Sequence, residues 1–250
     1  MDEVDFEIQP QPSNTTCGPT CLHAVYRYFT DVLPLKQVID EAASLSDGGS
    51  LGSLLGQHAL ARGYDATIYT FNVRVFDPSW FDEYGRGRPE LRAKLGEQIS
   101  AKDDAKLKFA CREYQKFLEA GGQLRMTDLT RKLIRQYLNR SIPIIAGLSS
   151  TFLYRAKREI GIDCRSDDVN GLPTGHFVVL CGYDRKTKMV SIADPYLPNP
   201  IAPSNNYYLV SVDRVVCAIL LGALTYDANL MILTPGKKKG LPRANTDRGQ

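Results

Sequence analysis

The sequence lacks any apolar run long enough to cross a bilayer, and it lacks an excess of charge of either sign. Its longest apolar stretch, from Val215 to Leu224, is too short for a transmembrane helix. The net charge of +3 comes from 31 basic and 28 acidic residues, a balance that gives no reason to expect a nucleic-acid partner. Residues 1–5 are mostly acidic and have no apolar segment typical of a secretory signal. We therefore expect a cytoplasmic protein with no membrane span and no nucleic-acid partner.

Cysteines are also scarce, and the sequence contains neither internal repeats nor low-complexity segments. Six cysteines in 250 residues are too few for a disulfide scaffold, and in a cytoplasm they should be reduced. Cys17 and Cys21, even with a histidine, lack a second Cys/His pair at ligand spacing, so we expect no metal site and no cofactor. Ordinary fractions of apolar (43%) and charged (24%) residues indicate a globular chain with a substantial core.

The periodicity of apolar residues predicts an α+β fold. Leu22, Val25, Tyr26 and Phe29 recur at helical spacing, which predicts a buried helix that begins near Gly18. Further helices are predicted at 35–44, 90–100, 103–120 and 213–221. Two more are predicted with a capping residue: one that Ser50 or Ser53 caps and that ends at residue 62, and one at 127–139 that Thr127 caps. Strands are predicted at 65–71, 142–147, 176–183, 189–194, 207–212 and 229–233, and a long loop at 148–173. A helix followed by a mostly antiparallel sheet is typical of the α+β class.

Cys17 lies where a nucleophilic cysteine would be activated. It stands just before Gly18 and Pro19, and proline suits the first turn of a helix because its missing N–H costs nothing there. The positive end of the helix dipole would then face the sulfur, and helix N-termini favour the thiolate that attacks a carbonyl. Unpaired N–H groups of the first turn would be available to a developing oxyanion.

His176 and Asp194 are expected to meet across a hairpin. The polar segment 183–188 separates two apolar runs, as a hairpin turn does. Pairing Tyr183 with Lys188 would bring His176 opposite Pro195, whereas a three-residue loop would bring it opposite Asp194; a bulge at Gly182 would shift either register. A carboxylate at that position would orient the imidazole and stabilise its charged form.

Gln11, six residues before Cys17, carries a side-chain N–H₂ that could serve as an oxyanion donor. Six residues of loop are enough for it to fold back towards the cysteine. Together the four residues form the set required by a papain-like cysteine hydrolase.

These motifs resemble a known family. Gln11, the run from Cys17 to Leu22, the run from Gly175 to Leu180, and Ala193-Asp194-Pro195 are similar to the papain-like cysteine peptidases that process bacteriocins at double-glycine leader sequences. The resemblance covers mainly residues 8–45 and 140–215. It implies Cys17 as nucleophile, His176 as general base and acid, Asp194 as the orienting residue and Gln11 as oxyanion donor, acting on a peptide or protein substrate.

The chain also departs from that family. Neither transmembrane segments nor an ATPase motif follow, so the resemblance is to a free-standing relative of the exporter domains. We expect residues 1–235 to form one catalytic domain with a helical insertion at about 72–125, through which a partner could bind. Residues 236–250 are expected to form a disordered, polar, basic tail. Cleavage after Gly-Gly is the property of the exporter domains that these departures support least for this chain.

Several alternatives remain open at this stage. The same triad could serve an acyltransferase, an isopeptidase or a deamidase, or the chain could be a peptide-binding module without catalysis. Cys17 could instead be a buried structural cysteine. Cys21, one helical turn later on the same face, is interpreted as a packing residue, with a resolving thiol in a redox role as the alternative.

Overall fold

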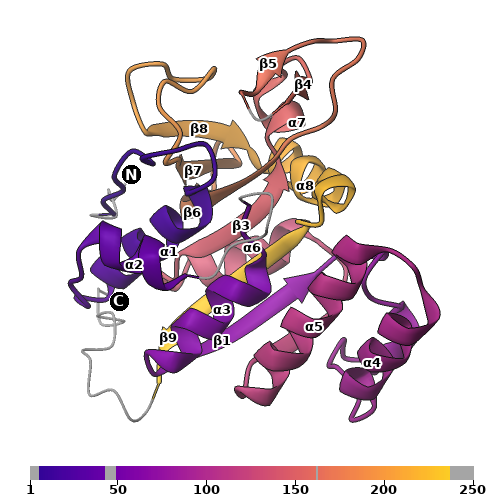
Figure 1. The fold of residues 1–250 in the computed structure, drawn as a ribbon. Coiled ribbons are helices and arrows are strands. Elements are labelled where there is room, and N and C mark those ends of the chain that lie inside the picture. Colours follow the sequence, from indigo (N-terminus) through magenta and orange to yellow (C-terminus); the bar gives the residue numbers. More distant parts are fainter. Residues whose placement is uncertain (1–5, 43–48, 162, 237–250) are drawn as a thin grey trace.

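In the computed structural model, residues 6–42, 49–161 and 163–236 are described. The chain forms a seven-stranded sheet in the order β2-β1-β9-β3-β6-β7-β8 (Figure 1). All neighbouring strands are antiparallel except β1 and β2, which are parallel. The predicted α+β class with a mostly antiparallel sheet is therefore confirmed.

The strands of this sheet are β1 (Tyr64–Thr70), β2 (Gln123–Arg125), β3 (Ile144–Ser149), β6 (Gly175–Asp184), β7 (Met189–Ala193), β8 (Tyr207–Ser211) and β9 (Asn229–Pro235). A separate two-stranded ribbon is formed by β4 (Glu159–Ile160) and β5 (Arg165–Ser166). The α-helices are α1 (Cys17–Tyr28), α2 (Leu35–Glu41), α3 (Gly52–Ala61), α4 (Leu91–Ala101), α5 (Ala105–Glu119), α6 (Arg131–Leu138), α7 (Ser150–Tyr154) and α8 (Val212–Leu221). Two 3₁₀ helices are η1 (Pro78–Trp80) and η2 (Gly222–Thr225).

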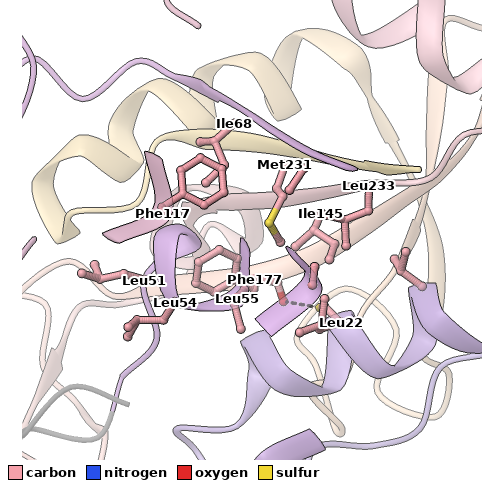
Figure 2. Packing of buried hydrophobic residues seen from close by; sticks show 14 of the residues in the cluster. Leu22, Leu51, Leu54, Leu55, Ile68, Phe117, Ile145, Phe177, Met231 and Leu233 are labelled. Carbon is pink, nitrogen blue, oxygen red and sulfur yellow. Dashed lines mark hydrogen bonds between the residues drawn. The ribbon is translucent and has the colours of Figure 1, made fainter. Parts of the chain in front are cut away.

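Helices cover both faces of the sheet, each over its own apolar cluster. On one face, α1, α3 and α5 pack against side chains that include Ile145, Phe177 and Met231, as Figure 2 shows for α1, α3 and Phe117 of α5. On the other face, α6 and α8 cover a second cluster that includes Ile144, Val178 and Leu230. The alternation of these neighbours along β3, β6 and β9 is what a sheet buried on both faces requires.

Helix α1 is positioned by its apolar face. Leu22 and Val25, one helical turn apart, are essentially unexposed and lie in the cluster against the sheet. Cys21 reinforces this contact, since its Sγ donates a hydrogen bond of 3.3 Å to the carbonyl of Phe177 in β6. The predicted helix start is confirmed to within one residue, and the first turns of α1 lie near the start of β6.

Three local predictions are wrong, and one strand was missed. Helix α3 begins after Leu51 without a side-chain cap, so neither Ser50 nor Ser53 caps it. Thr130, not Thr127, caps α6 by accepting a hydrogen bond from the N–H of Leu133. The 148–173 segment contains α7 and the β4–β5 ribbon, elements too short to show a clear period. The short edge strand β2 was not predicted at all.

Segment 72–125 contributes η1, α4, α5 and β2. Its helices are not a detached unit, because Leu95 of α4 and Tyr114 and Phe117 of α5 belong to the main apolar cluster. The predicted tail, from residue 236, lies outside the described residues except for Gly236.

Candidate active site

The β6–β7 hairpin carries His176 at its open end. Asp184 pairs with Met189, so the loop has four residues, and a bulge between Leu180 and Gly182 shifts the register by one. Val179 therefore pairs with Ala193, the last residue of β7. Both predicted registers are wrong: the first placed the four-residue loop one residue too early in the chain, and the second assumed a loop of three residues. The proximity they implied is nevertheless present, since His176 Nε2 lies 2.8 Å from Asp194 Oδ1.

Asp194 is completely buried and its carboxylate accepts four hydrogen bonds. Oδ1 accepts from His176 and from the backbone N–H of Tyr196 at 2.9 Å. Oδ2 accepts from the hydroxyls of Tyr154 at 2.7 Å and Tyr208 at 2.6 Å. Although burial alone would raise the pKa of Asp194, His176 and the two tyrosines hold it below its usual value. Asp194 is thereby kept as a fixed anion.

His176 lies between that anion and Cys17. Burial alone would lower its pKa, but the charge of Asp194, then that of Cys17, and hydrogen bonds to both raise the pKa to about 10. Because Nε2 faces Asp194, Nδ1 is the ring nitrogen that remains for the sulfur. An imidazolium held next to a cysteine at a helix N-terminus is the arrangement that activates a thiol for nucleophilic attack.

Cys17 and Cys21 have different surroundings. Cys17 is the first residue of α1, where the backbone N–H groups of a helix have no intrahelical acceptor. Cys21 is fully buried, and burial first, then Cys17 and Asp194, raise its pKa well above the ordinary value. Together with its hydrogen bond to Phe177, this supports the interpretation of Cys21 as a packing residue.

The backbone of Gln11 is hydrogen-bonded to Pro195, the residue that follows Asp194. Its backbone N–H donates to the carbonyl of Pro195 at 2.8 Å, which ties the N-terminal loop to the segment after β7. Its Nε2 donates to the carbonyl of Ser13 at 2.8 Å, and its Oε1 is buried without a partner among the described residues. Since Nε2 carries two N–H groups, one remains available for a substrate oxygen.

The tyrosines were missed from the sequence. Tyr208 belongs to a predicted strand, for which no side-chain partner was predicted, and Tyr154 lies in the segment interpreted as a loop. The only sequence clue was that long loops in compact domains are often functional.

Comparison with known proteins identifies the chain. A profile of the Peptidase C39-like family matches residues 2–208, more than four-fifths of the sequence. The chain belongs to that family. The family and the enzyme class predicted from the motifs are confirmed, and the protein is a cysteine peptidase. No curated protein matches the sequence of this C39-like peptidase.

Solved structures that resemble this C39-like peptidase share little sequence with it. A double glycine motif protease from an AMS/PCAT transporter, in complex with the leader peptide, is 14% identical, with 93% of each chain covered and a TM-score of 0.43. The peptidase domain of Streptococcus ComA, a bi-functional ABC transporter involved in a quorum sensing pathway, is 12% identical (92% and 99% covered, TM-score 0.44). A Bacillus anthracis protein described as a C39-like peptidase is 13% identical (93% and 96% covered, TM-score 0.45).

Two kinds of feature are absent from the residues that the structure describes. None of their helices has the length and apolar character needed to cross a membrane. In the same part of the chain, no three His, Cys, Asp or Glu side chains form a group that could hold a metal ion.

Proposed function

We propose that this cysteine peptidase cleaves a peptide bond with Cys17 as nucleophile, His176 as general acid and base, and Asp194 as the orienting carboxylate. The hydrogen bond between His176 and the buried Asp194 carries the proposal, because it leaves the imidazole only one nitrogen to face Cys17. The pKa of His176, raised to about 10, keeps the imidazole protonated beside Cys17 at neutral pH, so that it can act as the general acid.

In the first half of the reaction the Cys17 thiolate attacks the substrate carbonyl. The negative charge that develops on the carbonyl oxygen is stabilised by the first N–H groups of α1 and by the second N–H of Gln11 Nε2. When the C–N bond breaks, the proton held by His176 passes to the leaving amine, and Cys17 remains as a thioester.

In the second half a water molecule attacks the thioester. Neutral His176 now accepts a proton from that water, and the acid product leaves as the Cys17 thiolate is restored. Throughout both halves Asp194 keeps its charge and holds the imidazole in place, since four donors make its protonation unfavourable.

The orienting role of Asp194 is tested by Asp194→Asn. The amide keeps the shape of the side chain but does not stabilise an imidazolium, so we expect kcat to fall at least a hundredfold. The melting temperature should change little, because the tyrosine hydroxyls can accept hydrogen bonds from the new amide. Unchanged turnover would exclude Asp194 from the mechanism. Hydrolysis of a peptide, followed by product analysis in the presence of added amines, would separate a peptidase from an acyltransferase.

For the substrate, we propose a peptide processed by removal of a leader segment. The support is family membership together with the Gln11, Cys17, His176 and Asp194 motifs described above. Mass spectrometry of leader-containing peptides incubated with the wild type and with Cys17→Ala tests this: a single internal cut made only by the wild type is expected. Cleavage without regard to a leader would contradict it.

A partner that binds segment 72–125 is the second part of the proposal. Arg86, Arg88, Arg92 and Arg125 line one hollow on this segment. Glu119 pairs with Arg92 at 3.1 Å, and the hollow remains predominantly cationic. Arginine forks suit carboxylates, so the partner we propose is an acidic peptide segment.

Labelled octaglutamate is a suitable probe for the hollow. Its binding should weaken at least tenfold in Arg86→Glu/Arg125→Glu and fall with added salt. Lys132→Glu, at an exposed position on α6, is the matched control and should bind as the wild type does. Equal binding by all three proteins would remove this partner proposal. A cytoplasmic location and a single catalytic domain over residues 1–235 stay predictions.

A further inference from the structure

The sheet face beneath α3 and α5 changes from apolar to polar at the end nearest His176. Ile68 of β1 and Met231 of β9 are paired and belong to the apolar cluster drawn in Figure 2. Two residues further along, and so on the same face, Thr70 and Asn229 form the next pair, and Asn229 also pairs with Gly147 of β3. Both polar residues are completely buried.

Asn229 has no hydrogen-bond partner for either side-chain atom among the described residues. Its amide lies against glycines: a Cβ placed on Gly52 would lie 3.2 Å from it, and one on Gly147 only 2.8 Å from its Nδ2. Ser53 Oγ and Asn72 Nδ2 are also buried without partners in the described structure. Because buried polar groups are normally hydrogen-bonded, this cluster calls for a hydrogen-bonding occupant.

Asp227 adds a carboxylate to the same end of the sheet. It is 6% exposed, and only its Oδ2 has a hydrogen-bond partner within the described ranges, the Thr225 hydroxyl at 2.7 Å. The residues on either side of it, Tyr226 and Ala228, have φ angles of +70° and +51°, in the left-handed region. Non-glycine residues held there are strained, and such strain gathers at functional sites.

Asp227 lies against the strand that carries His176, and Ser50, just before α3, lies against the helix that carries Cys17. Gly175 precedes His176, and a Cβ on Gly175 would lie only 2.0 Å from Asp227 Oδ2. Gly18 follows Cys17, and a Cβ there would meet Ser50, two residues before Gly52, at 3.0 Å.

We propose that Asn229 and Asp227 form a specificity subsite that binds the carboxamide side chain of an Asn or Gln residue close to the scissile bond. The inference rests on Cys17 as the proposed nucleophile. A carboxamide both donates to and accepts from the Asn229 amide, and its second N–H suits the Asp227 carboxylate. Lys106 and His176 already act on Asp227 as positive charges, which favours a neutral side chain over a basic one.

The test is a positional library of acetyl-tetrapeptide aminomethylcoumarin amides with Asn, Gln, Gly, Leu or Lys at each of three varied positions. We expect kcat/KM at one position to be at least tenfold higher for Asn or Gln than for Leu. Asn229→Leu, which keeps the branched shape of the side chain and removes both hydrogen-bonding atoms, should abolish or reverse this ratio. Asn139→Leu, at an exposed position at the end of α6, is the matched control and should preserve it.

An identical side-chain profile in the wild type and Asn229→Leu would overturn the subsite, as would a preference for glycine at all three positions. If circular dichroism shows that Asn229→Leu is not folded, Asn229→Ala and Asp227→Ala take its place. Equal rates for the wild type and Cys17→Ala would contradict the nucleophile instead. Calorimetric binding of the Asn and Leu peptides to Cys17→Ala then decides the subsite alone: tenfold tighter binding of the Asn peptide supports it, and equal binding refutes it.

Discussion

Tyr208 donates a hydrogen bond of 2.6 Å to Oδ2 of Asp194, the carboxylate oxygen that His176 does not use. Tyr154, from α7, donates to the same oxygen at 2.7 Å. The carboxylate is therefore held by residues from three separate parts of the chain: β6, α7 and β8. Its orientation is fixed before any substrate binds, as electrostatic preorganisation requires.

Replacing either tyrosine should weaken catalysis without removing any proposed reacting group. Tyr208→Phe and Tyr154→Phe each take one donor from Asp194, so we expect kcat to fall about tenfold and the unfolding free energy by about 2 kcal/mol. With fewer donors, the pKa of Asp194 should rise, and the titration of its partner His176 should shift as well. Measuring the His176 titration by NMR separates this role from a purely structural one, which would lower stability and leave the titration unchanged.

Selective alkylation tests the state of Cys17. Burial raises the pKa of Cys21 well above its usual value, raises that of Cys111, and raises that of Cys181 to about 12, so these thiols should resist limiting iodoacetamide. Cys217 is exposed and serves as an internal reference for an accessible thiol outside the site. Peptide mass mapping should find the label on Cys17 at about pH 6, and not in His176→Ala. Labelling of Cys17 no faster than Cys217 would argue against an activated thiolate.

Asp227 should make the stability of the protein depend on pH. Burial raises its pKa from 3.8 to about 7, so its contribution to stability is complete below about pH 3.8 and is lost as pH rises through about 7. Asp227→Asn, which does not ionise, should therefore be more stable than the wild type at about pH 8, by up to about 4 kcal/mol. Thermal unfolding at several pH values should show the difference vanish by about pH 4; a constant difference would contradict the shift.

Gly175 and Asp227 should be coupled. Gly175→Ala introduces a methyl group into the space of the Asp227 carboxylate, so we expect a loss of about 1–3 kcal/mol in stability together with a loss of activity as His176 is displaced. Asp227→Ala in the same chain removes the clash and should restore part of both losses. A double-mutant cycle measures the coupling energy, and additive effects would mean that the two residues do not constrain one another.

The sequence predicted the fold class and the proximity of His176 to Asp194 because both depend on local patterns. His176 and Asp194 are separated by a single hairpin, so any short loop brings them near each other. The register itself depends on the four-residue loop and on the bulge at Cys181, which turn residues alone do not specify. Tyr154 and Tyr208 reach Asp194 only through tertiary packing of α7 and β8, and α7 is too short to have a readable period.

Caps and unpaired polar groups were harder still to predict. Serine is a residue type that often caps helices, but Leu51 is the residue that precedes α3. The hydroxyl of Ser53 is buried inside the fold instead of capping the helix. Asn229 begins a strand that is otherwise apolar, and nothing in its neighbours along the chain indicates that its amide has no partner. The surroundings of the Asn229 amide are formed where β1, β3 and β9 pair at Thr70, Gly147 and Asn229, and this pairing is seen only in the folded chain.

The packing of α5 has a consequence for how this chain could have changed over time. Phe117 fills the space beside Gly56 of α3 so closely that a Cβ on the glycine would lie 2.5 Å from its ring. A shorter ancestor or descendant without α5 would leave Gly56 and Ile68 open to water, and would need bulkier residues at those positions. Removal of the segment therefore requires substitutions in α3 and β1, and a minimal version of this enzyme must be redesigned there, not simply trimmed.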